Sequence, residues 1–303
     1  MYVASRKSLG NECYKAVKSL AGRMFFHDRG HGHVTGDIYS WRMPLIPVGL
    51  RLLLVGLHLL YGALQVALLF RLGGAPWRQR LKRNWSRQLL TLLGIRVKAD
   101  ADSLAGIEAG LLVANHISFI DIFVINTLLP CAFVAKSEVA RWPLIGWLSR
   151  HTDTVFIERG SRKAAHQTHQ QMLAALRAGS RLAIFPEGTT TAGDRLLPFH
   201  GALFQSAIDA AVPVHALAVS YHRADGVRSE APAYIDDIRL VDCLISVLQA
   251  GGLVARVTLA ARFAPPLPDR RHLAHRAHQA VAAALAHSED SSQPLRNTAA
   301  ISW

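Results

Sequence analysis

The sequence contains little cysteine and few acidic residues. Its three cysteines, Cys13, Cys131 and Cys243, lie too far apart for a disulfide framework or a zinc pattern, so a reducing compartment is expected. Aspartate and glutamate number 21 against 34 lysines and arginines, which leaves a formal net charge of +13. Because the chain is also 50% hydrophobic, its expected partner is an anionic membrane surface or a nucleic acid.

The patterns of several enzyme classes are also missing. The sequence has no G-x-S-x-G nucleophile elbow of a lipid-cleaving serine hydrolase. It has no G-x-G-x-x-G or P-loop pattern for binding a nucleotide. The first apolar segment starts too far from Met1 for a signal peptide, and no small-residue cleavage site follows it. Neither hydrolysis by a serine nucleophile nor nucleotide-dependent chemistry is therefore supported.

The two ends of the chain are polar. Residues 1–43 mix charged and polar side chains, and we expect a polar, disordered extension. Its run His27–His33 carries several histidines, but no second cluster of ligands supports a metal site, and a Gly-rich flexible segment is the favoured interpretation. Residues 288–303 are expected to form a disordered tail. We therefore expect no bound metal.

Residues 44–93 predict two helices. Leu52–Phe70 is almost wholly apolar, and as a helix it would rise about 28 Å, close to the hydrocarbon thickness of a bilayer. A narrow polar stripe repeats every seven residues on one face of it: Arg51, His58 and Gln65. The second segment is rich in arginine and carries Trp77 and Trp85 on its apolar face, which is typical of membrane-surface helices. We predict a membrane-associated hairpin in the cytoplasmic leaflet; a helix pair buried in the globular core is the alternative.

From Gly94 onward, short apolar runs alternate with helical patterns. Seven runs predict β-strands, at residues 95–99, 111–114, 131–135, 154–157, 182–185, 214–221 and 254–260. Helices are predicted over Arg162–Ala178, which Gly179 ends, and over Arg270–His287. This alternation predicts an α/β domain over residues 94–287, with a mixed sheet flanked by helices on both faces.

The stretch Leu111–Asp121, L-L-V-A-N-H-I-S-F-I-D, carries the candidate catalytic residues. Its apolar run delivers His116 to the carboxyl end of a strand, the edge at which α/β sheets bind ligands. His116 can act there as a general base, and Asp121 can reach the imidazole across one helical turn and stabilise the imidazolium. The alternative is a capping box, with Ser118 as N-cap and Asp121 at N3, which would make His116 an ordinary loop residue.

Three further stretches place polar side chains after predicted strands. F-V-A-K-S-E ends a strand with Lys136, T-V-F-I-E-R-G ends one with Arg159, and I-F-P-E-G-T-T-T presents Glu187 at a glycine turn. A guanidinium suits bidentate phosphate binding, and the backbone N–H groups of a glycine turn can bind further oxygens or an oxyanion. Each residue alone has a structural alternative as a surface ion pair, a solvated charge or a turn. Their convergence on one sheet edge favours an anion-binding active site.

The motifs N-H-I-S-F-I-D, F-I-E-R and F-P-E-G-T-T, in this order and spacing, resemble those of the glycerolipid acyltransferases. More narrowly, they resemble the bacterial 1-acyl-sn-glycerol-3-phosphate (lysophosphatidate) acyltransferase family, over residues 45–285. The resemblance implies a lysophospholipid acceptor, an acyl thioester donor (acyl-CoA or acyl carrier protein), a membrane, no cofactor and no nucleic acid. The sequence departs from the family's fourth motif at Ala216, where a second proline is expected after Pro213.

Carried over to this sequence, the resemblance implies a role for each motif. His116 would be the general base for the acceptor hydroxyl, and Asp121 its orienting partner. Arg159 would bind the acceptor phosphate and Lys136 would be a second phosphate contact. Three residues would shape the acceptor pocket: Glu187, Gly188 and Thr189. The implied location is the inner (cytoplasmic) membrane, with the active site facing the cytoplasm.

Two alternatives to this function remain open. The first keeps the chemistry and changes the acceptor to a lyso-ornithine lipid, another lysophospholipid or glycerol 3-phosphate. The second is a non-enzymatic basic module, which predicts charge spread over a surface and aromatic residues spaced for stacking on bases. The basic residues here are instead concentrated in the segment after Gly74, which favours a membrane.

Overall fold

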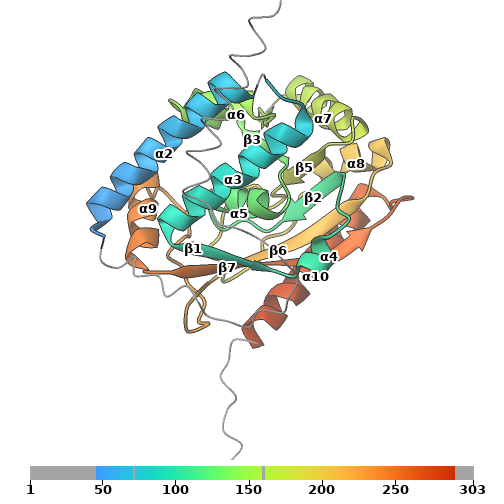
Figure 1. The fold of residues 1–303 in the computed structure, drawn as a ribbon. Coiled ribbons are helices and arrows are strands. Elements are labelled where there is room, and N and C mark those ends of the chain that lie inside the picture. Colours follow the sequence, from blue (N-terminus) through green and yellow to red (C-terminus); the bar gives the residue numbers. More distant parts are fainter. Residues whose placement is uncertain (1–45, 71, 159–160, 291–303) are drawn as a thin grey trace, which may run out of the picture. The chain divides into compact units, whose positions relative to one another are not determined.

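The computed structural model describes residues 46–70, 72–158 and 161–290. The predicted extension over residues 1–43, with the His27–His33 run, lies outside the described residues, as do residues 291–303 of the predicted tail. The described part contains a seven-stranded sheet in the order β1-β7-β6-β2-β5-β3-β4, and Figure 1 shows helices on both of its faces. The predicted mixed α/β fold is confirmed.

All seven predicted strands are present within the described residues. They are β1 (Ile95–Ala99), β2 (Gly110–Ala114), β3 (Ala132–Lys136), β4 (Val155–Ile157), β5 (Arg181–Ile184), β6 (Val214–Arg223) and β7 (Leu253–Phe263). Neighbouring strands are parallel except β6 and β7, which are antiparallel. Every residue of the central strand β2 is buried, as expected of an apolar run covered on both faces. The edge strand β1 alternates, with Arg96 and Lys98 less buried than Ile95.

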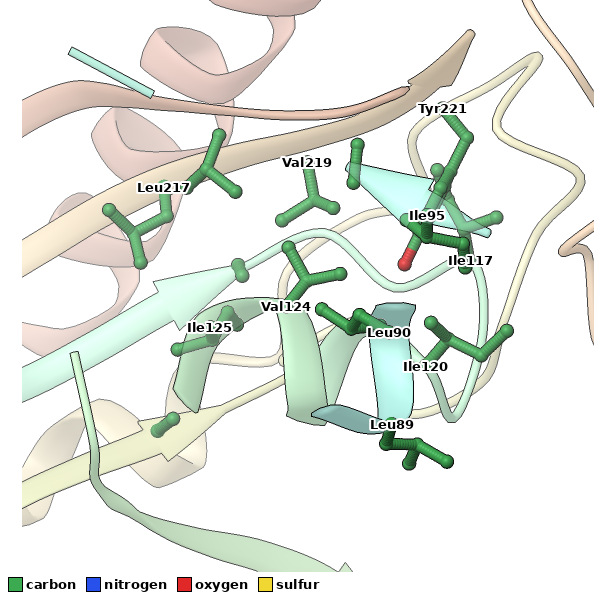
Figure 2. Packing of buried hydrophobic residues seen from close by; sticks show 14 of the residues in the cluster. Leu89, Leu90, Ile95, Ile117, Ile120, Val124, Ile125, Leu217, Val219 and Tyr221 are labelled. Atoms are coloured by element: carbon green, nitrogen blue, oxygen red, sulfur yellow. The ribbon is translucent and has the colours of Figure 1, made fainter. Parts of the chain in front are cut away.

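Helices cover the two faces of the sheet with separate apolar cores. One face carries α2 (Val48–Leu69), α3 (Ala75–Leu93), α5 (Asp121–Leu128) and α9 (Leu240–Gln249). The other carries α7 (Arg162–Arg177), η3 (Gly201–Phe204), α8 (Gln205–Ala210) and α10 (Arg270–Asp290). Shorter elements connect them: α4 (Ala101–Leu104), η2 (Ser137–Arg141) and α6 (Ile145–His151). In Figure 2, Leu217, Val219 and Tyr221 of β6 face Leu90 of α3 and Val124 of α5.

Two residues of the polar stripe of α2, Arg51 and His58, point into the protein. Arg51 is 4% exposed, and its guanidinium donates to the carbonyl oxygens of Leu248 (3.0 Å) and Leu92 (3.2 Å). Both carbonyls lie in the last turn of a helix, where a cation is favourable. His58 stacks on Trp85 at 5.0 Å, and the Trp85 indole N–H donates to the His58 carbonyl at 3.1 Å. Arg51 and His58 therefore bind α2 to the neighbouring helices and do not face solvent.

The opposite face of α2 is apolar and exposed. Six leucines spaced three to four residues apart are 48–58% exposed: Leu50, Leu53, Leu57, Leu60, Leu64 and Leu68. We call them the leucine face. In α3, Leu89, Leu90 and Leu93 near its end are buried inside the protein, whereas Trp77 near its start is 38% exposed. Of the predicted hairpin, α2 thus presents the larger apolar surface to the outside.

Candidate active site

The structure brings His116 and Asp121 together. His116 follows β2, and Asp121 is the first residue of α5. The imidazole Nδ1 lies 2.9 Å from Oδ2 of Asp121. The aspartate is fully buried, whereas the His116 side chain is 19% exposed. The predicted contact between imidazole and carboxylate is therefore present, and the histidine is the member that a substrate can reach.

The Asp121 carboxylate accepts three further hydrogen bonds. Its Oδ2 accepts from the backbone N–H of Ile117 (2.8 Å) and of Ser118 (3.0 Å). Its Oδ1 accepts from the hydroxyl of Tyr221 at 2.7 Å. The bond to Ser118 is one half of the predicted capping box, but α5 begins at Asp121 with Ile120 as its N-cap and without a side-chain cap bond, so the predicted box is not formed. Asp121 both starts α5 and aims the imidazole.

The bond to Asp121 defines which imidazole nitrogen is free to react. A carboxylate is an acceptor, so Nδ1 of His116 carries the proton of this pair and Nε2 keeps a lone pair. The ring is stacked on Phe185 with centroids 3.9 Å apart and planes 10° apart. Phe133 stacks behind Phe185 at 6.1 Å. This aromatic stack and Asp121 hold the imidazole in one orientation, with Nε2 as its basic atom.

Glu187 binds the backbone of the loop that carries His116. Its Oε1 accepts from the N–H of His116 (2.8 Å) and its Oε2 from the N–H of Leu197 (2.9 Å). Glu187 is 3% exposed. Burial raises the pKa of its carboxyl, and the two backbone hydrogen bonds oppose that rise. The residue joins the loop after β2 to the turn after β5; its implied role in an acceptor pocket stays a prediction.

The turn after β5 also fits the predicted pattern. Gly188 has a φ of +73°, a backbone conformation that favours glycine, and its N–H donates to the carbonyl of Phe185 at 3.1 Å. Thr189 next to it is exposed. The N–H of Thr191 donates to the carbonyl of His116 at 2.9 Å. This turn therefore lies beside the loop that carries His116, with Thr189 accessible.

The remaining predicted residues follow strands of the same sheet edge. Strands β2, β5, β3 and β4 are parallel neighbours, so their carboxyl ends share one edge. Lys136 ends β3, is exposed, and pairs with Ile157 at the end of β4. Arg159 lies outside the described residues. No group of three or more His, Cys, Asp or Glu side chains in the described ranges is arranged to hold a metal ion.

Two contributors to the site were not assigned a role from the sequence. Asn115 exchanges two hydrogen bonds with the backbone of Val219, at 2.9 and 2.7 Å, and so continues the pairing of β2 with β6. Tyr221 holds Asp121 from the same strand β6. No separate signal in the sequence marked Tyr221, because the same buried strand also carries His215, Ser220 and His222.

The chain is similar to known acyltransferases. The family model described as Acyltransferase matches residues 96–220. A lyso-ornithine lipid O-acyltransferase of Pseudomonas aeruginosa is 40% identical over 227 residues, which is 73% of this chain and 85% of that protein. A 1-acyl-sn-glycerol-3-phosphate acyltransferase of Neisseria meningitidis is 34% identical over 220 residues, 72% of this chain and 86% of that protein.

The fold is similar to a solved structure as well. The crystal structure of the 1-acyl-sn-glycerophosphate acyltransferase from Thermotoga maritima matches with a TM-score of 0.57 at 20% sequence identity. The match covers 82% of this chain and 100% of that chain. At this identity the likeness supports the fold.

Proposed function

The chain belongs to the acyltransferase family of the glycerolipid acyltransferase superfamily, and from this membership we propose which reaction it catalyses. It moves a fatty acyl group from an acyl thioester to the 2-hydroxyl of 1-acyl-sn-glycerol 3-phosphate, which gives phosphatidic acid. The observation that carries the proposal is the contact between His116 and the buried Asp121 at the sheet edge.

The reaction proceeds by direct transfer, without an acyl-enzyme. Nε2 of His116 takes the proton of the acceptor hydroxyl while the oxygen attacks the thioester carbonyl. Asp121 stabilises the imidazolium that forms. The C–S bond then breaks, and the proton passes from His116 to the leaving thiolate. A thioester is already an activated acyl donor, so the proposed reaction uses no metal and no cofactor.

Positioning supplies most of the remaining acceleration. General base catalysis contributes typically about 10²–10⁴-fold, and holding two reactants in a reactive geometry contributes more. Lys136 at the end of β3, and Arg159 after β4, are the proposed contacts of the acceptor phosphate. Strands β3 and β4, which precede these two residues in the chain, end on the same sheet edge as β2.

A second acceptor is supported by a specific observation. The relative that is 40% identical is named a lyso-ornithine lipid O-acyltransferase, and the relative named for the glycerophosphate acceptor is 34% identical. Both acceptors are lysolipids with a free hydroxyl, but one carries a phosphate and the other an amino acid head group. The same catalytic pair serves either acceptor.

A panel of acceptors tests the proposal. Purified protein is incubated with radiolabelled acyl-CoA, or with acyl carrier protein carrying the same chain, and with one lysolipid at a time. We expect labelled phosphatidic acid from 1-acyl-sn-glycerol 3-phosphate. If only lyso-ornithine lipid is labelled, the proposed acceptor is wrong, but the proposed acyl-transfer reaction is supported. Labelling of no lysolipid with either donor would contradict the proposed reaction.

We further propose that α2 lies in the cytoplasmic leaflet of the inner membrane. By length and composition, α2 is apolar enough to cross a membrane. However, Arg51 near its start and His58 in its middle both bond to the rest of the protein, which favours a helix that lies along the domain. The leucine face then enters the lipid and brings the site to a membrane-bound acceptor.

Charge on the leucine face is expected to release the protein from lipid. The triple variant Leu53→Glu, Leu57→Glu and Leu60→Glu replaces side chains that are 53–58% exposed, so it should fold normally. We expect at least about a tenfold weaker association with anionic vesicles in co-sedimentation, because three apolar side chains become charged. Acylation of a lysolipid in detergent micelles should persist.

A matched control separates membrane contact from net charge. The variant His272→Glu, His275→Glu and Gln279→Glu adds the same charges to the exposed face of α10, and it should sediment with vesicles nearly as the wild type does. Equal loss of vesicle binding in both variants would show that net charge alone causes it. Wild-type sedimentation of the α2 variant would contradict the proposed membrane face.

A further inference from the structure

Tyr221 reaches the catalytic pair from the middle of the sheet. It lies on β6 and is 1% exposed, and its hydroxyl donates to Oδ1 of Asp121 at 2.7 Å. In Figure 2 the hydroxyl points away from β6 toward the side of the sheet that carries α5. We propose that Tyr221 is a positioning residue for acyl transfer, acting through Asp121; this rests on the proposed function.

The two oxygens of Asp121 divide the bonds between them. Oδ2 accepts from His116, Ile117 and Ser118 within one short loop. Oδ1 accepts from Tyr221, 100 residues further along the chain. The terminal torsion of an aspartate is broad, so bonds to Oδ2 alone leave the carboxylate plane free to turn. The hydroxyl of Tyr221 fixes that plane and keeps Oδ2 directed at the imidazole.

The surroundings keep Tyr221 a donor. Burial and the charge of Asp121 raise the pKa of its phenol well above the usual value, so the hydroxyl retains its proton. The titratable groups that face Asp121 from the other elements are His116 after β2, Glu187 after β5 and Cys243 on α9. Burial raises the pKa of the Cys243 thiol to about 11, so it stays neutral.

Tyr221 also belongs to the apolar core, which its ring helps to fill. A purely structural role would come from the ring, whereas the positioning role comes from the hydroxyl. Tyr221→Phe keeps the ring and removes the hydroxyl, so it separates the two roles.

The test is the steady-state kinetics of Tyr221→Phe. We expect kcat to fall about tenfold, because a hydrogen bond to a charged group is lost, and the KM values of both substrates to change less than about twofold. A loss of core packing alone would lower the folded fraction and leave kcat per folded molecule unchanged.

Tyr234→Phe is the matched control. The Tyr234 ring packs edge-on against Phe119 near the same loop, and removing its hydroxyl should leave kcat unchanged. If the wild type is active and Tyr221→Phe has the same kcat, the positioning role is overturned. A lower melting temperature with unchanged kcat per folded molecule would overturn it as well. An inactive wild type would instead reject the proposed function itself.

Discussion

Replacing His116 with alanine is expected to lower the rate of acyl transfer by about 10³–10⁴-fold. The substitution removes Nε2, the atom proposed to take the proton of the acceptor hydroxyl. The protein should stay folded, because the imidazole is partly exposed and the backbone bond from residue 116 to Glu187 does not need the side chain. The measurement is the initial rate of radiolabelled diacyl product, together with circular dichroism and vesicle binding.

A histidine away from the site serves as the control for this variant. His166→Ala changes an exposed residue of α7 and should retain the wild-type rate. If His116→Ala kept more than about a tenth of the wild-type rate, the assignment of His116 as general base would fail. Such a loss would be much smaller than the loss that removing a general base usually causes. Loss of vesicle binding or of helical signal in His116→Ala would point to misfolding and not to lost chemistry.

Asp121→Asn is expected to have the second largest effect, a loss of about 10²–10³-fold in kcat. The amide is uncharged and so does not stabilise the imidazolium. Its NH₂ group would also face donors, because Ile117, Ser118 and Tyr221 all donate to this side chain. Unlike His116→Ala, this variant should be destabilised as well, by about 2 kcal/mol.

Kinetics and urea unfolding measure the two effects of Asp121→Asn separately. Asp102→Asn on the exposed surface of α4 is the control. Its kcat and its free energy of unfolding should both match those of the wild type. An Asp121→Asn enzyme with wild-type kcat and lowered stability would show that the carboxylate only holds the backbone of the loop before α5. The motif would then be structural.

The strands could be predicted because a buried strand is a short apolar run. Strand β2, with all five residues buried, is the clearest case. The reversal of β7 against β6 could not be predicted, because strand pairing is set by tertiary contacts. Helix α9 could not be predicted from its apolar sequence, because a short apolar run fits a buried helix as well as a strand.

The membrane segment shows a related limit. The sequence of α3 indicates an amphipathic helix, but periodicity does not say whether lipid or protein covers the apolar face. The structure places Leu89 and Leu90 against the protein. In α2 it turns the polar residues Arg51 and His58 inward, which explains how a largely apolar helix carries them.

In the candidate site, contacts between residues close in the sequence could be predicted, and contacts between distant residues could not. The contact of His116 with Asp121 could be predicted, because Asp121 lies five positions after His116, across one turn. The bond from Glu187 to the His116 backbone spans 71 residues, and the bond from Tyr221 to Asp121 spans 100. Such contacts depend on which strands become neighbours, which short motifs do not encode.

A double-mutant cycle tests most directly whether His116 and Asp121 act as one catalytic unit. It compares kcat/KM of the wild type, His116→Ala, Asp121→Asn and the double variant on the same lysolipid and thioester. If Asp121 acts through the imidazole, the double variant should be no slower than His116→Ala alone, within about threefold. If the two losses multiply fully, the residues act independently and the proposed proton transfer through this pair is contradicted.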